Sequence, residues 1–209
     1  YPALWRLRSA FAMIVRQPGP MDFMHEALRQ ARRAMQAEET PIGAVIVRDG
    51  RIIARGFNQR EMRQDVTLHA EMTAIRRACA KLDSWRLDGC DLYVTLEPCA
   101  MCAGAIQQAR IARVFFGTED PKAGAVVSRM RFFDLPDTNH VVKYETGLLA
   151  AESAAMLREF FAWLRARDKV LGTKGARRDL AKAQIRHKRG DAGAKSPGIA
   201  DKESMDGKP

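Results

Sequence analysis

Residues 91–117, DLYVTLEPCAMCAGAIQQARIARVFFG, contain two strand-like segments on either side of a helix-like one. Residues 91–96 are rich in residue types that favour β-structure, and Pro98 ends that segment. Residues 99–110 predict a helix, and residues 111–117 predict the next strand. This strand–helix–strand unit is typical of α/β proteins and forms the centre of the predicted fold.

The segments on either side continue the same alternation. An Asp49-Gly50 pair, a strong hairpin signal, joins two short apolar runs into predicted antiparallel strands. The remaining predicted elements are a helix over 21–38, the hairpin strands over 43–47 and 51–57, a helix over 68–82, a strand over 141–145 and a helix over 149–164. Helices that alternate with strands in this way indicate an α/β fold, with a mixed sheet between two helical layers.

Length and composition predict one folded domain with an extension at each end. A chain of 209 residues can bury one core, but it is too short for two ordinary domains and a linker. We expect a domain over 21–167, an N-terminal extension over 1–20 and a basic, disordered tail over 168–209, where large apolar residues are few. The basic, acid-free start could alternatively be an organelle transit peptide, although its low serine content favours a plain extension.

The net charge of +10 is a weak indication of a nucleic-acid partner. Residues 168–209 hold 11 Lys and Arg against 6 Asp and Glu, and residues 1–20 hold three arginines and no acid. Most of the charge therefore lies outside the predicted domain and does not locate a binding surface. No stretch approaches the ~18 apolar residues of a membrane span, so we expect no membrane partner. Four cysteines without a secretory signal favour a reducing, cytoplasmic location and metal binding over disulfides.

Two short motifs predict a catalytic metal site. His69 and Glu71 flank Ala70, and Cys99 and Cys102 lie three positions apart at the start of a predicted helix. One imidazole and two thiolates form a three-ligand zinc set, which leaves the fourth position of the ion for water. Glu71, two residues after the histidine, is then placed to move protons beside a zinc-activated hydroxide. We expect one Zn²⁺ per subunit.

A closed structural zinc site is the alternative that these residues leave open. Such a site needs a fourth protein ligand. The candidates for that ligand are Cys79, Cys90, His25, His140 and His187.

Longer strings resemble a known family, the bacterial tRNA-specific adenosine deaminases, over residues 21–167. The strings are Pro41 to Val45, Gly56-Phe57-Asn58, Thr67 to Glu71, Thr95 to Ile106, and Phe116-Gly117 with Asp120, Lys122 and Gly124. The resemblance implies a three-layer α/β/α cytidine-deaminase-like fold with a central mixed five-stranded sheet. It also implies hydrolytic deamination of adenosine to inosine at the wobble position of a tRNA anticodon, by a homodimer that grips the anticodon loop.

The resemblance further assigns roles to residues around the base. It implies that Asn58 hydrogen-bonds the extruded adenosine, that Ile42 and Leu96 line the base pocket, and that the Ala70 backbone amide holds the edge of the base. Without the resemblance, Asn58 would be interpreted as a turn residue, and Ile42 and Leu96 as ordinary core residues. All of these interpretations stay open at the level of the sequence.

Four more residues are assigned to the RNA by the same resemblance. Asp120 and Lys122 resemble residues that contact the anticodon loop in the family. Phe161 and Arg165 match an aromatic and basic pair on the last helix that the family places against the RNA. A plain surface loop and a core phenylalanine are the alternatives. The chain departs from the family in its two extensions and at Asp65-Val66-Thr67, where the family often has a proline before the threonine.

Two other functions remain as rivals. A deaminase of a free base or nucleoside, of guanine or cytosine type, would share the metal chemistry and differ in the pocket. A noncatalytic, zinc-stabilised RNA-binding module would keep the metal and have no need of Glu71.

Overall fold

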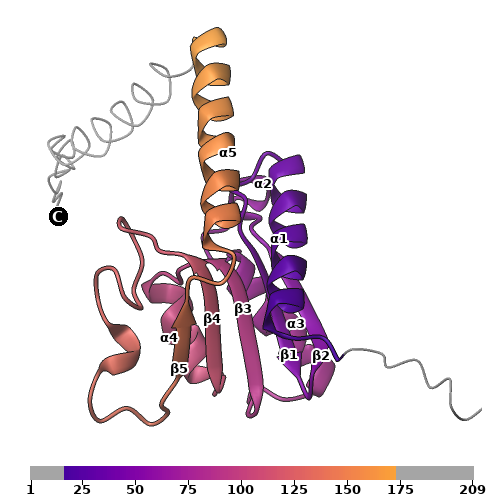
Figure 1. The fold of residues 1–209 in the computed structure, drawn as a ribbon, viewed down its shortest axis with the longest axis vertical. Coiled ribbons are helices and arrows are strands. Elements are labelled where there is room, and N and C mark those ends of the chain that lie inside the picture. Colours follow the sequence, from indigo (N-terminus) through magenta and orange to yellow (C-terminus); the bar gives the residue numbers. More distant parts are fainter. Residues whose placement is uncertain (1–16, 173–209) are drawn as a thin grey trace, which may run out of the picture. The chain divides into compact units, whose positions relative to one another are not determined.

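A five-stranded sheet in the order β2-β1-β3-β4-β5 forms the centre of the computed structural model, which describes residues 17–172 (Figure 1). β1 pairs antiparallel with both β2 and β3, whereas β3, β4 and β5 run parallel to one another. The strands are β1 (Gly43–Arg48), β2 (Arg51–Phe57), β3 (Cys90–Leu96), β4 (Arg113–Thr118) and β5 (Lys143–Thr146). The predicted mixed sheet is confirmed.

Helices cover both faces of this sheet. The helices are α1 (Pro20–Gln36), α2 (Arg60–Arg63), α3 (Ala70–Leu82), α4 (Ala100–Gln108) and α5 (Ala150–Val170), with a 3₁₀ turn η1 (Phe132–Asp134). α3 and α4 pack in one apolar cluster, and α1 packs in a second cluster on the opposite face. Met156 of α5 packs against Leu28 and Ala31 of α1 in a third, small cluster. The three-layer α/β/α architecture is therefore confirmed. The chain divides into two compact units, and the boundary lies between Phe161 and Ala162, within α5.

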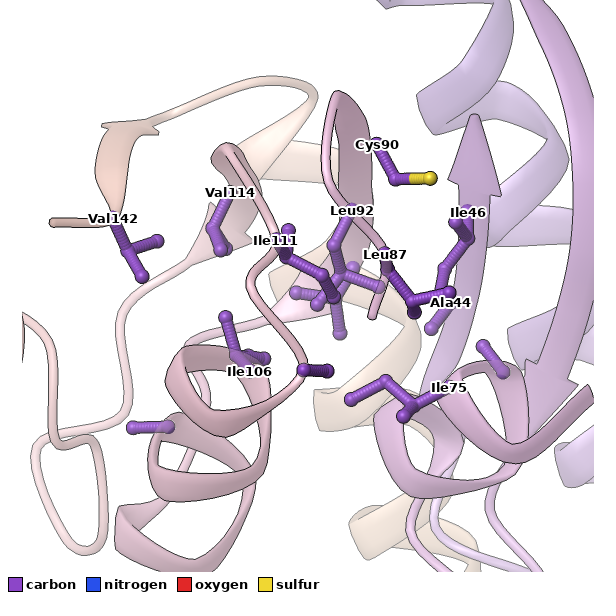
Figure 2. Close-up of a cluster of buried hydrophobic side chains, with 14 of the residues drawn as sticks. Ala44, Ile46, Ile75, Leu87, Cys90, Leu92, Ile106, Ile111, Val114 and Val142 are labelled. Atoms are coloured by element: carbon purple, nitrogen blue, oxygen red, sulfur yellow. The ribbon is translucent and has the colours of Figure 1, made fainter. Parts of the chain in front are cut away.

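Alternation along the strands produces the two apolar layers. In β1, Ala44 and Ile46 belong to the α3–α4 cluster, whereas Val45 and Val47 belong to the α1 cluster. Successive side chains of a strand point to opposite faces, so a strand buried on both sides is apolar throughout. Figure 2 shows the first cluster, in which Cys90 lies among aliphatic side chains such as Leu92 and Ile46.

The elements differ from the sequence predictions mainly at their ends. α3 begins at Ala70 rather than 68, and α5 continues to Val170, beyond the predicted end at 164. α2 and η1 were not predicted, because a single turn in a polar segment carries little periodicity. No helix in residues 17–172 has the length and apolar character needed to cross a membrane. Most of the two predicted extensions, residues 1–16 and 173–209, lies outside the described residues.

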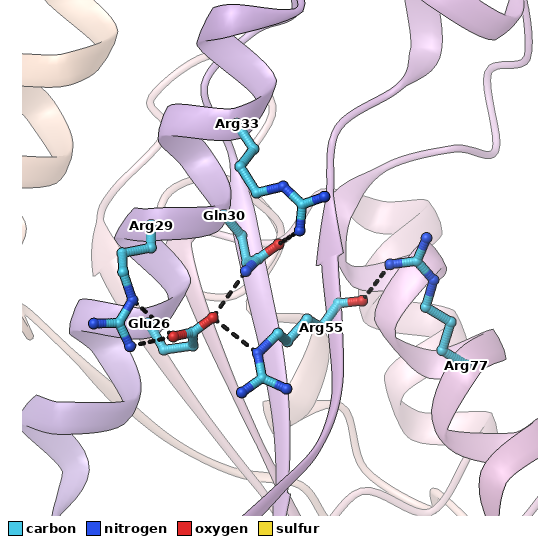
Figure 3. A network of polar contacts seen from close by, with 6 residues as sticks. All are labelled: Glu26, Arg29, Gln30, Arg33, Arg55 and Arg77. Atoms are coloured by element: carbon cyan, nitrogen blue, oxygen red, sulfur yellow. Dashed lines mark hydrogen bonds and ion pairs between the residues drawn. The ribbon is translucent and has the colours of Figure 1, made fainter.

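A polar network joins α1 and α3 to the outer strand β2 (Figure 3). The buried Glu26 carboxylate accepts hydrogen bonds from Arg29, Gln30 and Arg55, with Arg55 Nε at 2.8 Å from Glu26 Oε1. From the other side, Arg77 Nη1 donates to the Arg55 carbonyl at 2.8 Å. Burial opposes ionisation of Glu26, but the three donors outweigh it and lower its pKa below the usual 4.5.

This network predicts an acid-dependent loss of stability. Because the pKa of Glu26 is lower in the folded chain, its contribution is complete above pH 4.5 and disappears as the pH falls through the folded value. We expect Glu26→Gln to be less stable than the wild type in urea at pH 6, with a smaller difference at pH 3.5. An equal difference at both pH values would show that the charge of Glu26 is not what stabilises the network.

The strand ends bring distant segments together at one edge of the sheet. Residue 42 precedes β1, residue 58 follows β2, residues 97–99 follow β3 and residues 119–123 follow β4. Since β1 is antiparallel to both neighbours, its start lies beside the ends of β2 and β3. Gly56 lets α3 approach closely, because a Cβ there would overlap the Ala70 carbonyl. The start of α3 is thereby held against β2.

Candidate functional site

His69, Cys99 and Cys102 meet where α3 and α4 begin. His69 and Cys99 are the N-cap residues of the two helices, and Cys102 lies in the first turn of α4. The three ligand atoms lie within 4.8 Å of one another, and His69 Nδ1 is 3.6 Å from each of the two sulfurs. Helix N-termini favour the thiolate form, which is the form that binds metal.

The spacing of these atoms fits a tetrahedral zinc ion. Zinc–sulfur bonds of about 2.3 Å and zinc–nitrogen bonds of about 2.0–2.1 Å at tetrahedral angles place nitrogen and sulfur roughly 3.6 Å apart. The two measured nitrogen–sulfur distances agree with that value. Within residues 17–172, no fourth Cys, His, Asp or Glu joins this group, so the cluster is of the open, three-ligand kind.

The candidate fourth ligands of a closed site lie elsewhere. Cys90 is in the core, Cys79 Sγ faces the Trp85 carbonyl at 3.7 Å, and His140 Nε2 is 2.7 Å from the Ile111 carbonyl. His25 is exposed on α1. The remaining candidate, His187, lies outside the described residues.

The pKa values of the two thiols shift in opposite directions. The pKa of Cys99 is lowered to about 4, first because Cys102 donates a hydrogen bond to it. The same bond, together with burial, raises the pKa of Cys102. The hydrogen bond with Cys99 also raises the pKa of His69. Protons held among ligands in this way are the ones that a metal ion displaces on binding.

Glu71 is a buried acid beside this cluster. It is 4% exposed, and burial raises its pKa above the usual value. A raised pKa makes a carboxylate a stronger base, which suits a group that accepts and returns protons. Its position in a cavity wall distinguishes it from the solvated helix-capping acid that its sequence position alone would also allow.

A cavity of about 430 Å³ opens beside His69, Glu71 and Cys99. Its wall is formed by the sheet edge, the segment after β4 and two residues of α5. The other lining residues are Thr40, Ile42, Asn58, Arg60, Leu96, Glu97, Glu119, Asp120, Pro121, Lys122, Ala123, Leu157 and Phe161. The volume is in the range of small-molecule and cofactor sites.

The residues assigned by the resemblance fall mostly on this wall. Asn58 continues the hairpin rather than turning, because its backbone N–H donates to the Ile42 carbonyl. Ile42 and Leu96 are half-buried at the cavity, and Phe161 is 41% exposed there, so it is not a core residue.

Two further assignments are not among the residues that line the cavity. Ala70, fully buried, is the first residue of α3, where backbone N–H groups have no acceptor within the helix. Arg165 is on α5 in the second unit of the chain.

The turn before His69 has Val66 where the family often has a proline, and the residue before it, Asp65, is a hydrogen-bonded aspartate. Asp65 Oδ1 accepts from the Thr67 backbone N–H at 2.8 Å and from Thr67 Oγ1 at 2.6 Å. These bonds lower the pKa of Asp65. The Leu68 backbone N–H then donates to the Asp65 carbonyl. An Asp-centred turn of this kind fixes the chain without proline.

Glu97 organises the opposite wall and was missed from the sequence. Its carboxylate, 3% exposed, accepts backbone hydrogen bonds from Asp120, Val126, Val127 and Ser128 at 2.7–2.9 Å, and another from the Ser128 hydroxyl. Burial opposes ionisation, but these donors lower the pKa of Glu97 overall. One side chain thus shapes the segment that carries Asp120 and Lys122. The only signal in the sequence is an acid within an apolar strand end.

Gly124 leaves room for that carboxylate. A Cβ at this position would overlap both carboxylate oxygens of Glu97. We expect Gly124→Ala to cost about 1–3 kcal/mol of stability, because overpacking forces side chains or backbone to shift. Thermal unfolding of this variant beside Gly89→Ala, where nothing lies near the added Cβ, measures the effect. Because Gly89 has a positive φ, Gly89→Ala loses some stability through backbone strain alone. If Gly124→Ala lost no more stability than Gly89→Ala, the overlap with Glu97 would be contradicted.

Comparison with known proteins gives a consistent family assignment. A family model described as MafB19-like deaminase matches residues 20–165. The tRNA-specific adenosine deaminase of Agrobacterium fabrum is 54% identical over 139 residues, which cover 66% of this chain and 91% of that protein. The enzyme of the same name from Bacillus subtilis is 45% identical over 148 residues, with 71% and 92% covered.

Solved structures are also similar. A structure from a study of A-to-I editing by tRNA:A34 deaminases at the wobble position has a TM-score of 0.63 and 53% identity, covering 65% of this chain and 98% of that chain. A guanine deaminase from Nitrosomonas europaea has a TM-score of 0.57 and 25% identity, covering 69% and 85%. The fold is thus shared by proteins whose substrates differ.

Proposed function

This chain belongs to the MafB19-like deaminase family, and from that premise we propose that it converts adenosine to inosine at the wobble position of a tRNA anticodon. The observation that carries the proposal is the open His69, Cys99 and Cys102 cluster with the buried Glu71 beside it. The relatives that are about half identical to this chain carry the name of tRNA-specific adenosine deaminase, which supports adenosine in RNA as the substrate.

We assign the metal to His69, Cys99 and Cys102 and take it to be one Zn²⁺ per subunit, because their spacing matches zinc bond lengths. A bound zinc ion lowers the pKa of its water and supplies a nucleophile near neutral pH.

Glu71 takes the proton of the attacking water and delivers it to the ring nitrogen beside the attacked carbon. Glu71 then takes the proton of the newly added hydroxyl group and gives it to the departing amine, which leaves as ammonia while the hydroxyl becomes the carbonyl of inosine. Adenosine gains one water and loses one ammonia, so atoms and charge balance.

The cavity wall orients the nucleotide. Ile42 and Leu96 provide apolar surface for the base, Asn58 provides a polar side chain, and the Ala70 amide offers a donor at the N-terminus of α3. The enzyme must hold the base out of its stack, which costs least in an unpaired loop. This requirement is consistent with an anticodon loop.

The rim of the cavity is our proposed RNA contact. Asp120 and Lys122 lie in the segment held by Glu97, and the Lys122 backbone N–H donates to Asp120 Oδ1 at 2.9 Å. Phe161 exposes an aromatic face that can stack on a base. Arg165, one helical turn further along the sequence of α5, is assigned to phosphate.

We infer that the protein works in the cytoplasm as a homodimer. Four free thiols fit a reducing compartment, and one small domain offers limited surface for gripping an RNA loop. Light scattering of the purified chain measures the oligomeric state, and a monomer that edits at full rate would contradict the dimer.

The substrate is identified by comparing the activity of the protein on RNA with its activity on free bases and a nucleoside. The full chain is incubated with a tRNA carrying A34, with a tRNA carrying G34, and with adenosine, guanine and cytosine, and inosine and ammonia are measured. We expect product from the A34 tRNA alone. Activity confined to free bases would overturn the proposal in favour of the free-base rival, and binding of the tRNA without product would favour the noncatalytic module.

A further inference from the structure

Glu39 is a buried carboxylate for which the proposed reaction has no use. It follows the end of α1 and is 0% exposed. Its Oε2 accepts from Asn58 Nδ2 at 3.0 Å, and its Oε1 accepts from the Met62 backbone N–H at 2.6 Å. It therefore links the loop before β1 to Asn58 after β2 and to α2.

This contact fixes which end of the Asn58 side chain is available to a ligand. A carboxylate only accepts hydrogen bonds, whereas a carboxamide has a donor end and an acceptor end. The NH₂ group of Asn58 must therefore face Glu39, and Oδ1 is the end left over. Asn58 lines the cavity and is 4% exposed, and no group within residues 17–172 donates to its Oδ1.

We propose that Glu39 is a positioning residue that makes Asn58 a hydrogen-bond acceptor in the cavity, so that the nucleotide is held through one of its own N–H or O–H donors. The inference rests on the proposed function and adds a specificity element to it. In an adenosine within RNA, these donors are the exocyclic amino group and the ribose 2′-hydroxyl. The preference for a donor on the ligand is strong because the site is buried: a mismatched donor or acceptor cannot form a hydrogen bond with water instead.

The substitution Glu39→Gln should reverse the polarity of the site without changing its shape. The Met62 backbone N–H is a fixed donor, so the side-chain oxygen of the introduced glutamine must face it and the NH₂ of that glutamine must face Asn58. Asn58 can then satisfy that NH₂ only by turning its own oxygen toward it. The NH₂ group of Asn58 then faces the cavity, and we expect kcat/KM to fall about 10- to 100-fold.

A second substitution should restore the polarity. Asn58→Asp alone sets two carboxylates against each other and should also lower kcat/KM. In the double variant Glu39→Gln/Asn58→Asp, the introduced glutamine donates to one oxygen of the introduced aspartate, and the other oxygen of that aspartate faces the cavity as an acceptor. The double variant has the functional groups and net charge of the original pair in exchanged positions, so we expect activity within about threefold of the wild type.

The four proteins form a cycle with three readouts. These are kcat and KM on an anticodon stem-loop containing A34, the thermal unfolding midpoint, and zinc content. Glu38→Gln, at the exposed neighbouring position, is the matched control for the loss of one carboxylate. A stem-loop with 2′-deoxyadenosine at the target position separates the two donors. If the 2′-hydroxyl is the donor, the deoxy substrate lowers kcat/KM of the wild type but lowers that of Glu39→Gln little further. If the amino group is the donor, the deoxy substrate changes kcat/KM of both proteins by the same factor.

The cycle separates a positioning role from a merely structural one. Recovery of both unfolding midpoint and kcat/KM in the double variant supports the inference. Recovery of the unfolding midpoint without recovery of kcat/KM overturns it, and so does full activity in Glu39→Gln. A wild-type chain that deaminates free bases but not RNA contradicts the proposed function, and the cycle is then run on that base. An active wild type with no rescue contradicts only the role of Glu39.

Discussion

Glu71→Gln should lower the rate of deamination by about 100- to 10,000-fold while the protein keeps its fold and its metal. Glutamine has nearly the same shape but cannot take a proton from water or pass one to the base. Because the carboxyl group acts on reacting atoms, we expect the loss in kcat, with little change in KM. Single-turnover formation of inosine on an A34 stem-loop measures the chemical step directly.

The controls for this variant separate chemistry from structure. Glu159→Gln removes a carboxylate from an exposed position of α5 and should leave the rate unchanged. Zinc content and unfolding midpoint of Glu71→Gln should equal those of the wild type, since the ligand cluster of His69, Cys99 and Cys102 does not include this side chain. Full activity in Glu71→Gln would exclude it as the proton carrier, and loss of zinc would indicate that it ligates the metal.

Cys99→Ala should abolish zinc binding and lower stability together. The substitution removes one of the three proposed ligands, which lie where α3 and α4 begin. A ligand that binds only the folded state stabilises it by about 2.7 kcal/mol when its free concentration is about 100 times its Kd. We expect the unfolding midpoint of Cys99→Ala to match that of chelator-treated wild type and to show no response to added zinc.

Cys79→Ala is the matched control for a lost thiol. Cys79 is half-buried on α3 and its sulfur faces the Trp85 carbonyl, away from the cluster. This variant should keep one zinc per chain and the zinc-dependent rise in its unfolding midpoint. If Cys99→Ala retained zinc in equal amount, or if Cys79→Ala lost it, the assignment of the ligands would be wrong.

The buried acids show why the sequence predicted only part of the site. Within residues 17–172 the buried carboxylates are Glu26, Glu39, Glu71 and Glu97, and three of these surround the cavity or hold its wall. Only Glu71 was predicted, because it stands two residues from a histidine in a recognisable motif. Glu39 and Glu97 resemble solvated acids in the sequence, since their partners are an amide and backbone N–H groups far along the chain.

The sequence by itself determined the order of the longer helices and strands and the grouping of His69, Cys99 and Cys102. Alternating and helical periodicity are local properties, and they predicted the strand–helix–strand unit and the mixed sheet. The cluster that could hold a metal ion was predictable for the same reason, because His69, Cys99 and Cys102 are set by short spacings at the starts of two helices.

Only the tertiary structure decided how the cavity is built around that cluster. Its wall combines the start of β1, the ends of β2, β3 and β4, and Phe161 of α5, which become neighbours once the sheet has formed. The acceptor role of Asn58 and the shape of the segment after β4 depend on carboxylates that are buried only in the folded chain. A hydrogen bond gains its directing force when water is excluded from it, and that exclusion is a property of the packed molecule.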